Sequence, residues 1–286
     1  MKSLPDYPFR SNFVTINGMQ IHYIDEGESG SPAILFLHGV PTWSFTFRKI
    51  IPRCLENGLR VIAPDLPGFG KSEKPRKKEI FTLNNLIEWM EEFIRKRELS
   101  RLIIFGHDWG AIIGMILAAR NPELFSGMIL CNGYLPATGQ RIPFQLRLWK
   151  WFTRFSPVVP VGCVISCACK RHLSKAERAG YDYPFQRERD KTAIRILPQL
   201  ISFRKDKKEV SLFAGSWSQL KSFEKPVLTV FSSDDPITRG GDRIIQSLIP
   251  GAGNQPHRLL DGKHFLQEDA PEELAVIICE FVKNNP

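Results

Sequence analysis

The sequence predicts an α/β protein with a mostly parallel, doubly wound sheet that carries an inserted helical cap. Short apolar runs typical of buried parallel strands recur along the chain, at residues 33–37, 60–63, 102–105, 128–131 and 227–231. Segments with a helical pattern separate several of these runs, notably residues 83–97 and 111–120. This alternation favours a single sheet with helices on both faces.

An edge hairpin is expected near the N-terminus. Two alternating segments, residues 13–16 and 19–24, are joined by Asn17 and Gly18. An Asn-Gly pair between two alternating segments favours a tight two-residue turn. The chain therefore begins its sheet with two antiparallel strands at one edge.

The strand pattern stops between residue 134 and about residue 208. Aromatic residues, arginines and short helical segments replace it, and the strand series then resumes. An insertion that returns to the same sheet beside its loops is positioned to cover a pocket as a lid. We therefore divide the chain into a first core part (1–134), a helical cap (135–208) and a second core part (209–286).

Composition and charge narrow the classes of molecule that the chain is expected to bind. The chain has 286 residues, of which 43% are hydrophobic, and this is enough for a large core. Its net charge is +9, but the basic clusters at residues 71–78 and 204–208 contain acidic residues and no stacking aromatic residues. The clusters are typical of solvated loops, so we expect no nucleic-acid partner and no membrane partner.

The cysteines and the N-terminus indicate a cytoplasmic protein. The six cysteines are scattered mainly among apolar neighbours, which favours reduced thiols. No apolar run follows the N-terminal residues, so a secretion signal is not expected. The most apolar stretch, residues 155–169, is too short to span a bilayer and is interrupted by Pro157 and Pro160.

A candidate nucleophile lies between a predicted strand and a predicted helix. Gly106 and Gly110 flank Asp108 at two residues on either side. Small flanking residues permit the sharp turn of a nucleophile elbow, which projects its central side chain above the sheet. The alternative is a simple strand-to-helix turn in which Asp108 caps the helix.

A candidate acid and a candidate base follow in the chain order that the elbow requires. Asp235 comes just after the strand at 227–231, and His264 stands in a short loop near the C-terminus. We favour Asp235 over Asp234 as the orienting acid because Asp235 immediately precedes Pro236, where the chain leaves the strand. A lone histidine is more often structural, so His264 gains its interest from this order.

A turn after the strand at 33–37 completes the pattern. His38 and Gly39 lead to Val40, where the loop is expected to contribute one backbone N–H to an oxyanion hole. The residue after the nucleophile, Trp109, would contribute the other. Four such elements in the right order and context argue against coincidence.

Five motifs together resemble the haloalkane dehalogenase family of the α/β-hydrolase superfamily. They are residues 38–44 (HGVPTWS), 65–72 (DLPGFGKS), 106–110 (GHDWG), 235–238 (DPIT) and 264–268 (HFLQE). The similarity begins with residues 4–9 (LPDYPF) and is weaker in the cap, where residues 181–185 (YDYPF) still carry it. The resemblance implies an α/β-hydrolase fold and a small apolar halogenated substrate.

The resemblance also implies roles for individual residues. Asp108 would attack carbon, and the indole N–H of Trp109 would bind the departing halide. One branch of the family takes a second halide donor from a cap tryptophan and another from an asparagine after the His-Gly pair, where this chain has Val40. The cap candidate is then Trp149, with Trp151 as a rival and simple packing of both as the alternative.

Asn132 bears on the identity of the acid. Another branch of the family places its catalytic acid at this position, after the strand at 128–131. An asparagine there supports Asp235 as the acid.

An aspartate suits such a reaction because it is already anionic at neutral pH. It can displace a halide without a base if the pocket removes water from it and two N–H groups hold its second oxygen. His264 would then activate the water that hydrolyses the alkyl ester. The products are an alcohol, a halide and a proton, and the reaction needs no metal or organic cofactor.

Competing interpretations have specific weaknesses. Gly70, Lys71 and Ser72 resemble the end of a phosphate-binding loop, but Asp65 occupies the required leading glycine position. The spacing of Cys163, Cys167, Cys169 and His172 matches no common zinc site. Neither a phosphate loop nor a metal site is therefore expected.

Two other functions remain open at this point. An epoxide hydrolase would share the nucleophile and the histidine but would require acidic O–H donors, typically two tyrosines. The available tyrosines are Tyr134, Tyr181 and Tyr183, and a loop is expected around the last two. A catalytically silent binding module is the other alternative. The sequence leaves the oligomeric state open.

Overall fold

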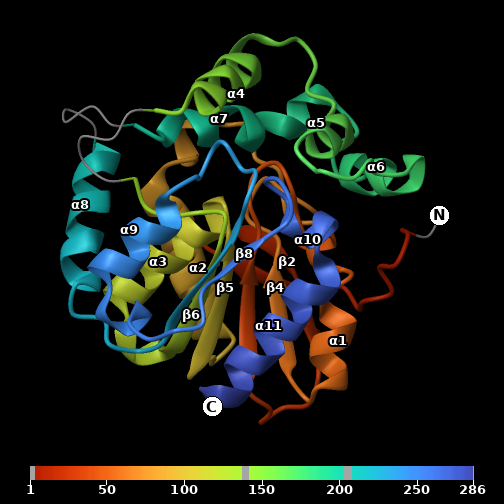
Figure 1. Cartoon of the computed structure of the whole chain (residues 1–286). Coiled ribbons are helices and arrows are strands. Elements are labelled where there is room, and N and C mark those ends of the chain that lie inside the picture. The colour runs from red at the N-terminus through yellow and green to blue at the C-terminus, as the bar shows by residue number, and fades with distance from the viewer. Residues whose placement is uncertain (1–3, 137–141, 203–207, 286) are drawn as a thin grey trace.

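A mostly parallel sheet forms the centre of the molecule (Figure 1). The computed structural model describes residues 4–136, 142–202 and 208–285. Within these residues the sheet has eight strands, in the order β1-β2-β4-β3-β5-β6-β7-β8. The strands are β1 (Asn12–Ile16), β2 (Met19–Glu26), β3 (Ala33–Leu37), β4 (Arg60–Pro64), β5 (Leu102–His107), β6 (Phe125–Cys131), β7 (Val227–Ser232) and β8 (Arg258–Leu260).

The antiparallel strands lie at one edge, as expected. β1 pairs with β2 and β2 with β4 in antiparallel register, while the pairs from β4 to β8 are parallel. Asn17 and Gly18 both have positive φ, 48° and 79°, and these values fit the tight turn between β1 and β2. The predicted hairpin is confirmed.

Helices cover both faces of the sheet, so the central strands are apolar along their length. β5 and β7 are buried at every position. α1 (Ile51–Glu56) packs with α11 (Pro271–Asn284), and α3 (Trp109–Arg120) packs with α2 (Leu83–Lys96) and α8 (Lys208–Leu220). α9 (Gly241–Leu248) packs on β7. The predicted doubly wound fold is confirmed.

α2 and α3 show how burial shapes the helices. α2 is amphipathic, with buried residues at i, i+3 and i+4 spacing, and Thr82 caps it by accepting a hydrogen bond from the Asn85 N–H at 3.1 Å. α3 follows the candidate nucleophile and is buried from Trp109 to Ala119. Its sequence is apolar on all sides because it packs between the sheet and other helices.

Four helices lie above the carboxyl ends of the central strands (Figure 1). They are α4 (Phe144–Phe155), α5 (Val161–Cys167), α6 (Lys175–Asp182) and α7 (Thr192–Leu200). α4 packs on α7, and α5 packs on α6. We refer to α4–α7 as the cap. Its exact limits at residues 135 and 208 stay a prediction, because residues 137–141 and 203–207 are outside the described ranges.

One local expectation is wrong. Tyr181 belongs to α6 instead of a loop, because Ser174 and Glu177 form a capping box that starts this helix and Pro184 follows its end. Much of the basic cluster at residues 204–208 lies outside the described residues. Among the described residues, no helix is both long and apolar enough to cross a membrane.

Candidate active site

Asp108 sits on a strained turn between β5 and α3. Its φ is 51° and its ψ is −116°, values that a residue with a side chain rarely adopts. The neighbouring chain must approach closely: a Cβ on Gly110 would lie 1.9 Å from the Leu37 carbonyl oxygen. The turn projects the carboxylate into a cavity, where its side chain is 19% exposed.

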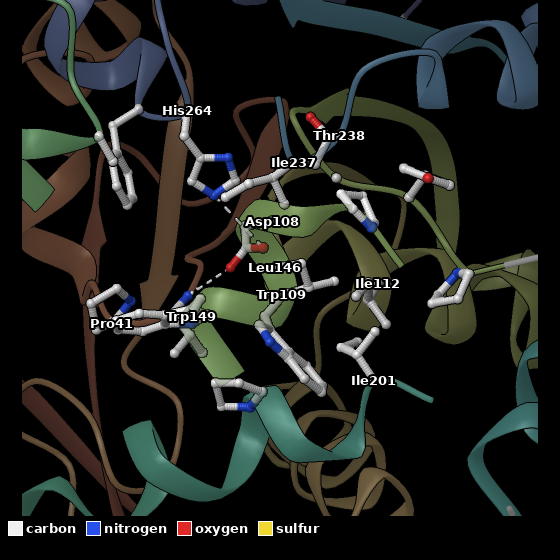
Figure 2. A pocket seen from close by; sticks show the side chains of 18 of the residues that line it. Pro41, Asp108, Trp109, Ile112, Leu146, Trp149, Ile201, Ile237, Thr238 and His264 are labelled. Carbon is white, nitrogen blue, oxygen red and sulfur yellow. Dashed lines mark hydrogen bonds and ion pairs between the residues drawn. The ribbon is translucent and has the colours of Figure 1, made fainter. Parts of the chain in front are cut away.

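The turn after β3 holds one oxygen of this carboxylate. The Val40 N–H donates to Asp108 Oδ2 at 2.9 Å (Figure 2). A Cβ on Gly39 would lie 2.6 Å from the Asp108 Cβ, so a glycine there permits the approach. Burial raises the pKa of Asp108, while the charge of His264 and the N–H groups of Val40 and Trp109 act in the opposite direction. Both N–H groups that the sequence proposed therefore act on Asp108.

His264 lies between the two aspartates. Its Nδ1 is 2.9 Å from Asp235 Oδ2. Its Nε2 is 3.8 Å from Asp108 Oδ1 (Figure 2). A carboxylate only accepts hydrogen bonds, so Nδ1 carries a proton and donates it to Asp235, while Nε2 is directed toward Asp108. The structure brings these three residues together in the order expected of a catalytic triad.

The electrostatics of His264 depend on both aspartates. Burial lowers the pKa of His264, but the charge and hydrogen bond of Asp235 and the charge of Asp108 outweigh it and raise the pKa to about 9. Removal of the Asp108 charge would therefore lower this pKa. Such a change would occur if Asp108 became an ester.

Asp235, and not its neighbour Asp234, orients the histidine. Asp235 is 1% exposed, accepts the Ile237 N–H at 2.9 Å, and also accepts the Thr238 hydroxyl. Burial alone would raise its pKa, but His264 and these donors lower it below the usual value. Asp234 is exposed to solvent. Asp235 is thus held as an anion next to Nδ1.

Two further polar residues position the His264 loop, and the sequence analysis missed this role. Asn132 donates from Nδ2 to the His264 carbonyl oxygen at 2.9 Å and accepts the Ser232 N–H at 2.8 Å. His107 donates from Nε2 to the same carbonyl oxygen at 2.8 Å, and burial lowers its pKa to about 3, so it stays neutral. Both residues stand directly beside recognised positions, at the end of β6 and before the nucleophile, and that proximity was the available signal.

The turn after β3 is held in a similar way. His38 donates from Nδ1 to the Gly39 carbonyl oxygen at 2.9 Å, and its Nε2 accepts the Leu66 N–H at 2.9 Å. Burial lowers the pKa of His38 and keeps it neutral. Asp65 begins the segment that resembled a phosphate loop, and it accepts the backbone N–H groups of Ser44 and Lys71 at 2.8 and 2.7 Å. The Asp65 carboxylate therefore joins this segment to the backbone of Ser44 and closes the segment on its own end at Lys71.

The cavity above Asp108 has a volume of about 170 Å³ and is lined mainly by apolar side chains. Core residues Trp109 and Ile112 line it, and so do Leu146 and Trp149 of α4 (Figure 2). Trp151 does not line it: its side chain is 60% exposed and packs on Phe155. The structure thus places both proposed halide donors, Trp109 and Trp149, around the carboxylate and places Trp151 on the outside of the cap.

The three tyrosines considered for an epoxide hydrolase lie in different surroundings. Tyr181 is buried and donates to Glu268 Oε1 at 2.6 Å, and Tyr183 is 39% exposed and stacks on Trp43. Tyr134 is the tyrosine that lines the cavity within the described residues. A pair of tyrosine hydroxyls from the cap therefore does not face Asp108 in this part of the chain.

A buried ion cluster joins the cap to the core beside the His264 loop. Glu268, in α10 (Leu266–Asp269), forms ion pairs with Arg48 and Lys49 of the core and with Arg171 of the cap. Glu177 of α6 also pairs with Arg48, at 3.2 Å. Burial would raise the pKa of Glu268, but its cationic neighbours and Tyr181 lower it. The cluster fixes α6 against the core.

No metal site is evident in the described ranges. Groups of three or more histidine, cysteine or acidic side chains that could hold an ion are absent there. All six cysteines lie in the described ranges and are free.

Comparison with known proteins supports the same fold and family. The family described as alpha/beta hydrolase fold matches residues 32–271. A haloalkane dehalogenase from Mycobacterium marinum is 37% identical over 279 residues, which cover 96% of this chain and 94% of the relative. One from Psychrobacter cryohalolentis is 36% identical over 290 residues, covering 99% and 96%.

Solved structures show the same architecture. A haloalkane dehalogenase from Paraglaciecola agarilytica, described as tetrameric, has a TM-score of 0.89 at 24% identity and covers 100% of this chain and 95% of its own. One from Bradyrhizobium elkani has a TM-score of 0.84 at 23% identity, covering 96% and 98%. Identity over nearly the full length, together with the matched fold family, shows that this chain belongs to the haloalkane dehalogenase family of α/β hydrolases.

Proposed function

We propose that the chain hydrolyses haloalkanes to an alcohol, a halide and a proton through an alkyl ester on Asp108. The observation that carries the proposal is the combination of a carboxylate in a mainly apolar cavity with two indole rings beside it and a histidine behind it. Membership of the haloalkane dehalogenase family supports the same activity.

The first step follows from the hydrogen bonds of the carboxylate. Oδ2 of Asp108 already accepts the Val40 N–H, so Oδ1 is the oxygen that attacks the carbon bearing the halogen. The new C–O bond forms as the carbon–halogen bond breaks, and the bonding pair leaves with the halide. The indole N–H groups of Trp109 and Trp149 stabilise the developing anion because the apolar cavity excludes competing water.

The second step uses His264. A water molecule loses a proton to Nε2 and attacks the ester carbonyl carbon, and the N–H groups of Val40 and Trp109 hold the oxyanion. Collapse of the intermediate releases the alcohol and restores Asp108, and the proton on His264 then leaves to solvent. Ester formation has removed one negative charge near His264, so its pKa falls and the histidine becomes unprotonated when a base is needed.

The cavity favours dehalogenation over epoxide opening. An epoxide yields an alkoxide that needs O–H donors, and the described cap tyrosines are bound to Glu268 or stacked outside the cavity. An intact set of Asp108, Asp235 and His264 likewise disfavours a silent binding module. We further propose a cytoplasmic location, which the six free cysteines support.

Halide release from chloro-, bromo- and iodoalkanes tests the proposal directly. The purified chain should release halide and one equivalent of alcohol, while Asp108→Ala should release neither. Terminal epoxides are tested as substrates in parallel. Diol formation from the epoxides, without halide release from the haloalkanes, would instead identify an epoxide hydrolase. A chain that binds these compounds but turns over neither class would contradict catalysis altogether.

A further inference from the structure

An exposed apolar stripe runs along the outer face of α4. Phe144, Leu148, Trp151 and Phe155 follow one another at spacings of four, three and four residues, and they are 69, 53, 60 and 61% exposed. This spacing places the four side chains on one face of the helix. α4 lies on the outside of the cap, with α7 between it and the sheet (Figure 1).

The stripe is not needed for the packing of the cap. The inner face of α4 is formed by Leu146, Trp149 and Thr153, of which Leu146 and Trp149 line the cavity and Thr153 is buried. Single exposed apolar residues are common, but a continuous row of large side chains on one helix marks an interaction surface. Because the row includes Trp and Phe, it has the composition of an interfacial helix.

The charge around this stripe is of one sign. Arg147 and Arg154, seven residues apart, follow one flank of the stripe, and both are exposed. The sequence contains no Asp or Glu between Glu123 and Glu177. Two of the acidic residues that follow are paired within the cap: Glu177 pairs with Arg171, and Glu188 pairs with Arg195. Within the described ranges, the outer face of α4 therefore combines apolar anchors with arginines that pair with no acidic side chain.

We propose that the outer face of α4 docks on the surface of a lipid bilayer that contains anionic phospholipids. The aromatic and leucine side chains enter the headgroup boundary, while Arg147 and Arg154 contact lipid phosphates. Charge complementarity favours this partner over a second copy of the chain. Two copies that met through this face would bring the arginines of both helices together, and like charges oppose such a contact.

This inference differs from the expectation, drawn from sequence alone, of no membrane partner. That expectation rested on basic clusters without aromatic residues and on the lack of a spanning segment. The structure shows a different basic surface, in which the aromatic residues of α4 face outward. Docking of this kind is peripheral and needs no helix that crosses the bilayer.

Docking would also place the cavity near a source of substrate. Leu146 and Trp149 line the cavity from the inner side of the same helix whose outer side carries the stripe. Apolar haloalkanes partition into lipid, so a cap that rests on the bilayer would meet them at high local concentration. This consequence rests on the proposed function, whereas the docking itself does not.

Flotation with vesicles tests the docking without any turnover. The full chain should float with vesicles of phosphatidylcholine mixed with phosphatidylserine and should stay in solution with phosphatidylcholine alone. Added salt should release it, because exposed charges are screened. Arg147→Gln with Arg154→Gln should weaken binding roughly 10- to 30-fold. Leu148→Ser with Phe155→Ser should weaken it roughly 100-fold.

Matched variants on other faces control for general changes in charge and apolar surface. Arg53→Gln with Arg258→Gln removes two exposed arginines elsewhere, and Leu259→Ser with Val276→Ser removes two exposed apolar side chains. Both controls should float like the unmodified chain. The midpoint of thermal unfolding of all four double variants should match that of the unmodified chain, since each replaced side chain is exposed.

Several results would overturn the proposal. They are failure to float with anionic vesicles, equal binding to neutral vesicles, or full binding by the α4 variants. Light scattering tests the alternative that this face binds a second copy of the chain. That alternative would hold if the unmodified chain were a dimer that did not bind vesicles, and if Leu148→Ser with Phe155→Ser converted it to a monomer.

Discussion

The core and the cap supply the site by different structural means. Asp108, Asp235 and His264 come from loops of the core, and several hydrogen bonds fix each loop. Trp149 comes from a cap helix whose opposite face is exposed. α4 packs on α7, and hydrogen bonds such as that from Gln199 Nε2 to the Lys150 carbonyl oxygen, at 2.9 Å, join the two helices. The contrast indicates that the core sets the chemistry, while the cap sets the shape of the cavity and its surroundings.

The largest effect is expected where the core carries the chemistry. His264→Phe removes the base but leaves the nucleophile, so the first step should proceed and the ester should accumulate. Hydrolysis of the ester should slow by at least ~10²–10⁴-fold, the usual contribution of a general base. Mass spectrometry of the intact protein and its peptides should locate the alkyl group on Asp108.

Asp108→Ala is the control for that experiment, because it should show neither adduct nor turnover. Normal turnover by His264→Phe without an adduct would contradict the proposed roles of both residues.

The junction between the two regions should be the next most sensitive place. Glu268→Gln leaves the guanidinium of Arg48 buried without its main charge partner, and such losses typically destabilise a fold by about 3–5 kcal/mol. Denaturant unfolding measures this change. The exposed pair Arg53 and Glu56 provides the comparison, and Glu56→Gln should leave the midpoint unchanged.

The contribution of Glu268 also has a defined pH dependence. Its pKa is lowered in the folded protein, so the stabilisation is fully present above the ordinary pKa of a glutamate, ~4.3, and is lost as the pH falls through the lowered value. Equal acid sensitivity of Glu268→Gln and the unmodified chain would show that the cluster contributes little.

The two neighbouring tryptophans of the cap separate an inner from an outer role. Trp149→Phe keeps an aromatic ring but loses the N–H donor, so halide release should slow by roughly one to two decades, equivalent to about 1.5–3 kcal/mol. Trp151→Phe should have no effect on the rate, because Trp151 faces solvent. Quenching of tryptophan fluorescence by bromide gives an independent measure of halide binding.

Two results for these tryptophan variants would contradict the assignment of Trp149 as the halide donor of the cap. Loss of activity only in Trp151→Phe would mean that α4 presents its other face during catalysis. Full activity in both variants would place the second halide donor elsewhere.

The smallest expected effect is a shift in the titration of His264. Its pKa is raised to about 9 because Asp235 and Asp108 favour the imidazolium, so the free enzyme holds a protonated histidine at neutral pH. Asp108→Asn should lower this pKa, and Asp235→Asn should lower it further because Asp235 has the larger influence. Imidazole NMR signals would follow both changes.

The pH dependence of ester hydrolysis follows from the same titration of His264. A base must be unprotonated, so the single-turnover rate should fall as pH decreases through the pKa of His264 in the ester. This midpoint should lie below that of the free enzyme, since the ester has no Asp108 charge. A rate that stays constant across the range in a folded protein would exclude His264 as the base.

The sequence by itself determined the strands of the sheet other than β8, the edge hairpin and the position of the elbow. These features depend on local patterns: apolar runs for strands buried on both faces, Asn17 and Gly18 for the turn, and closely spaced glycines around Asp108. It also predicted Asp235 and His264 as candidates, because Asp235 follows a predicted strand and the two residues follow Asp108 in the chain order that the elbow requires.

Only the tertiary structure decided which polar groups meet across long separations in the chain. Asn132 and His107 donate to the His264 carbonyl oxygen, and Tyr181 donates to Glu268. The partner in each of these three contacts is not given by any local sequence pattern. The two faces of α4 are a similar case. Its pattern alternates large apolar residues on both sides, so the sequence left Trp149 and Trp151 as rivals, and packing on α7 decided which side faces the cavity. The physical reason is that helix periodicity defines faces, whereas burial of one face depends on what packs against it.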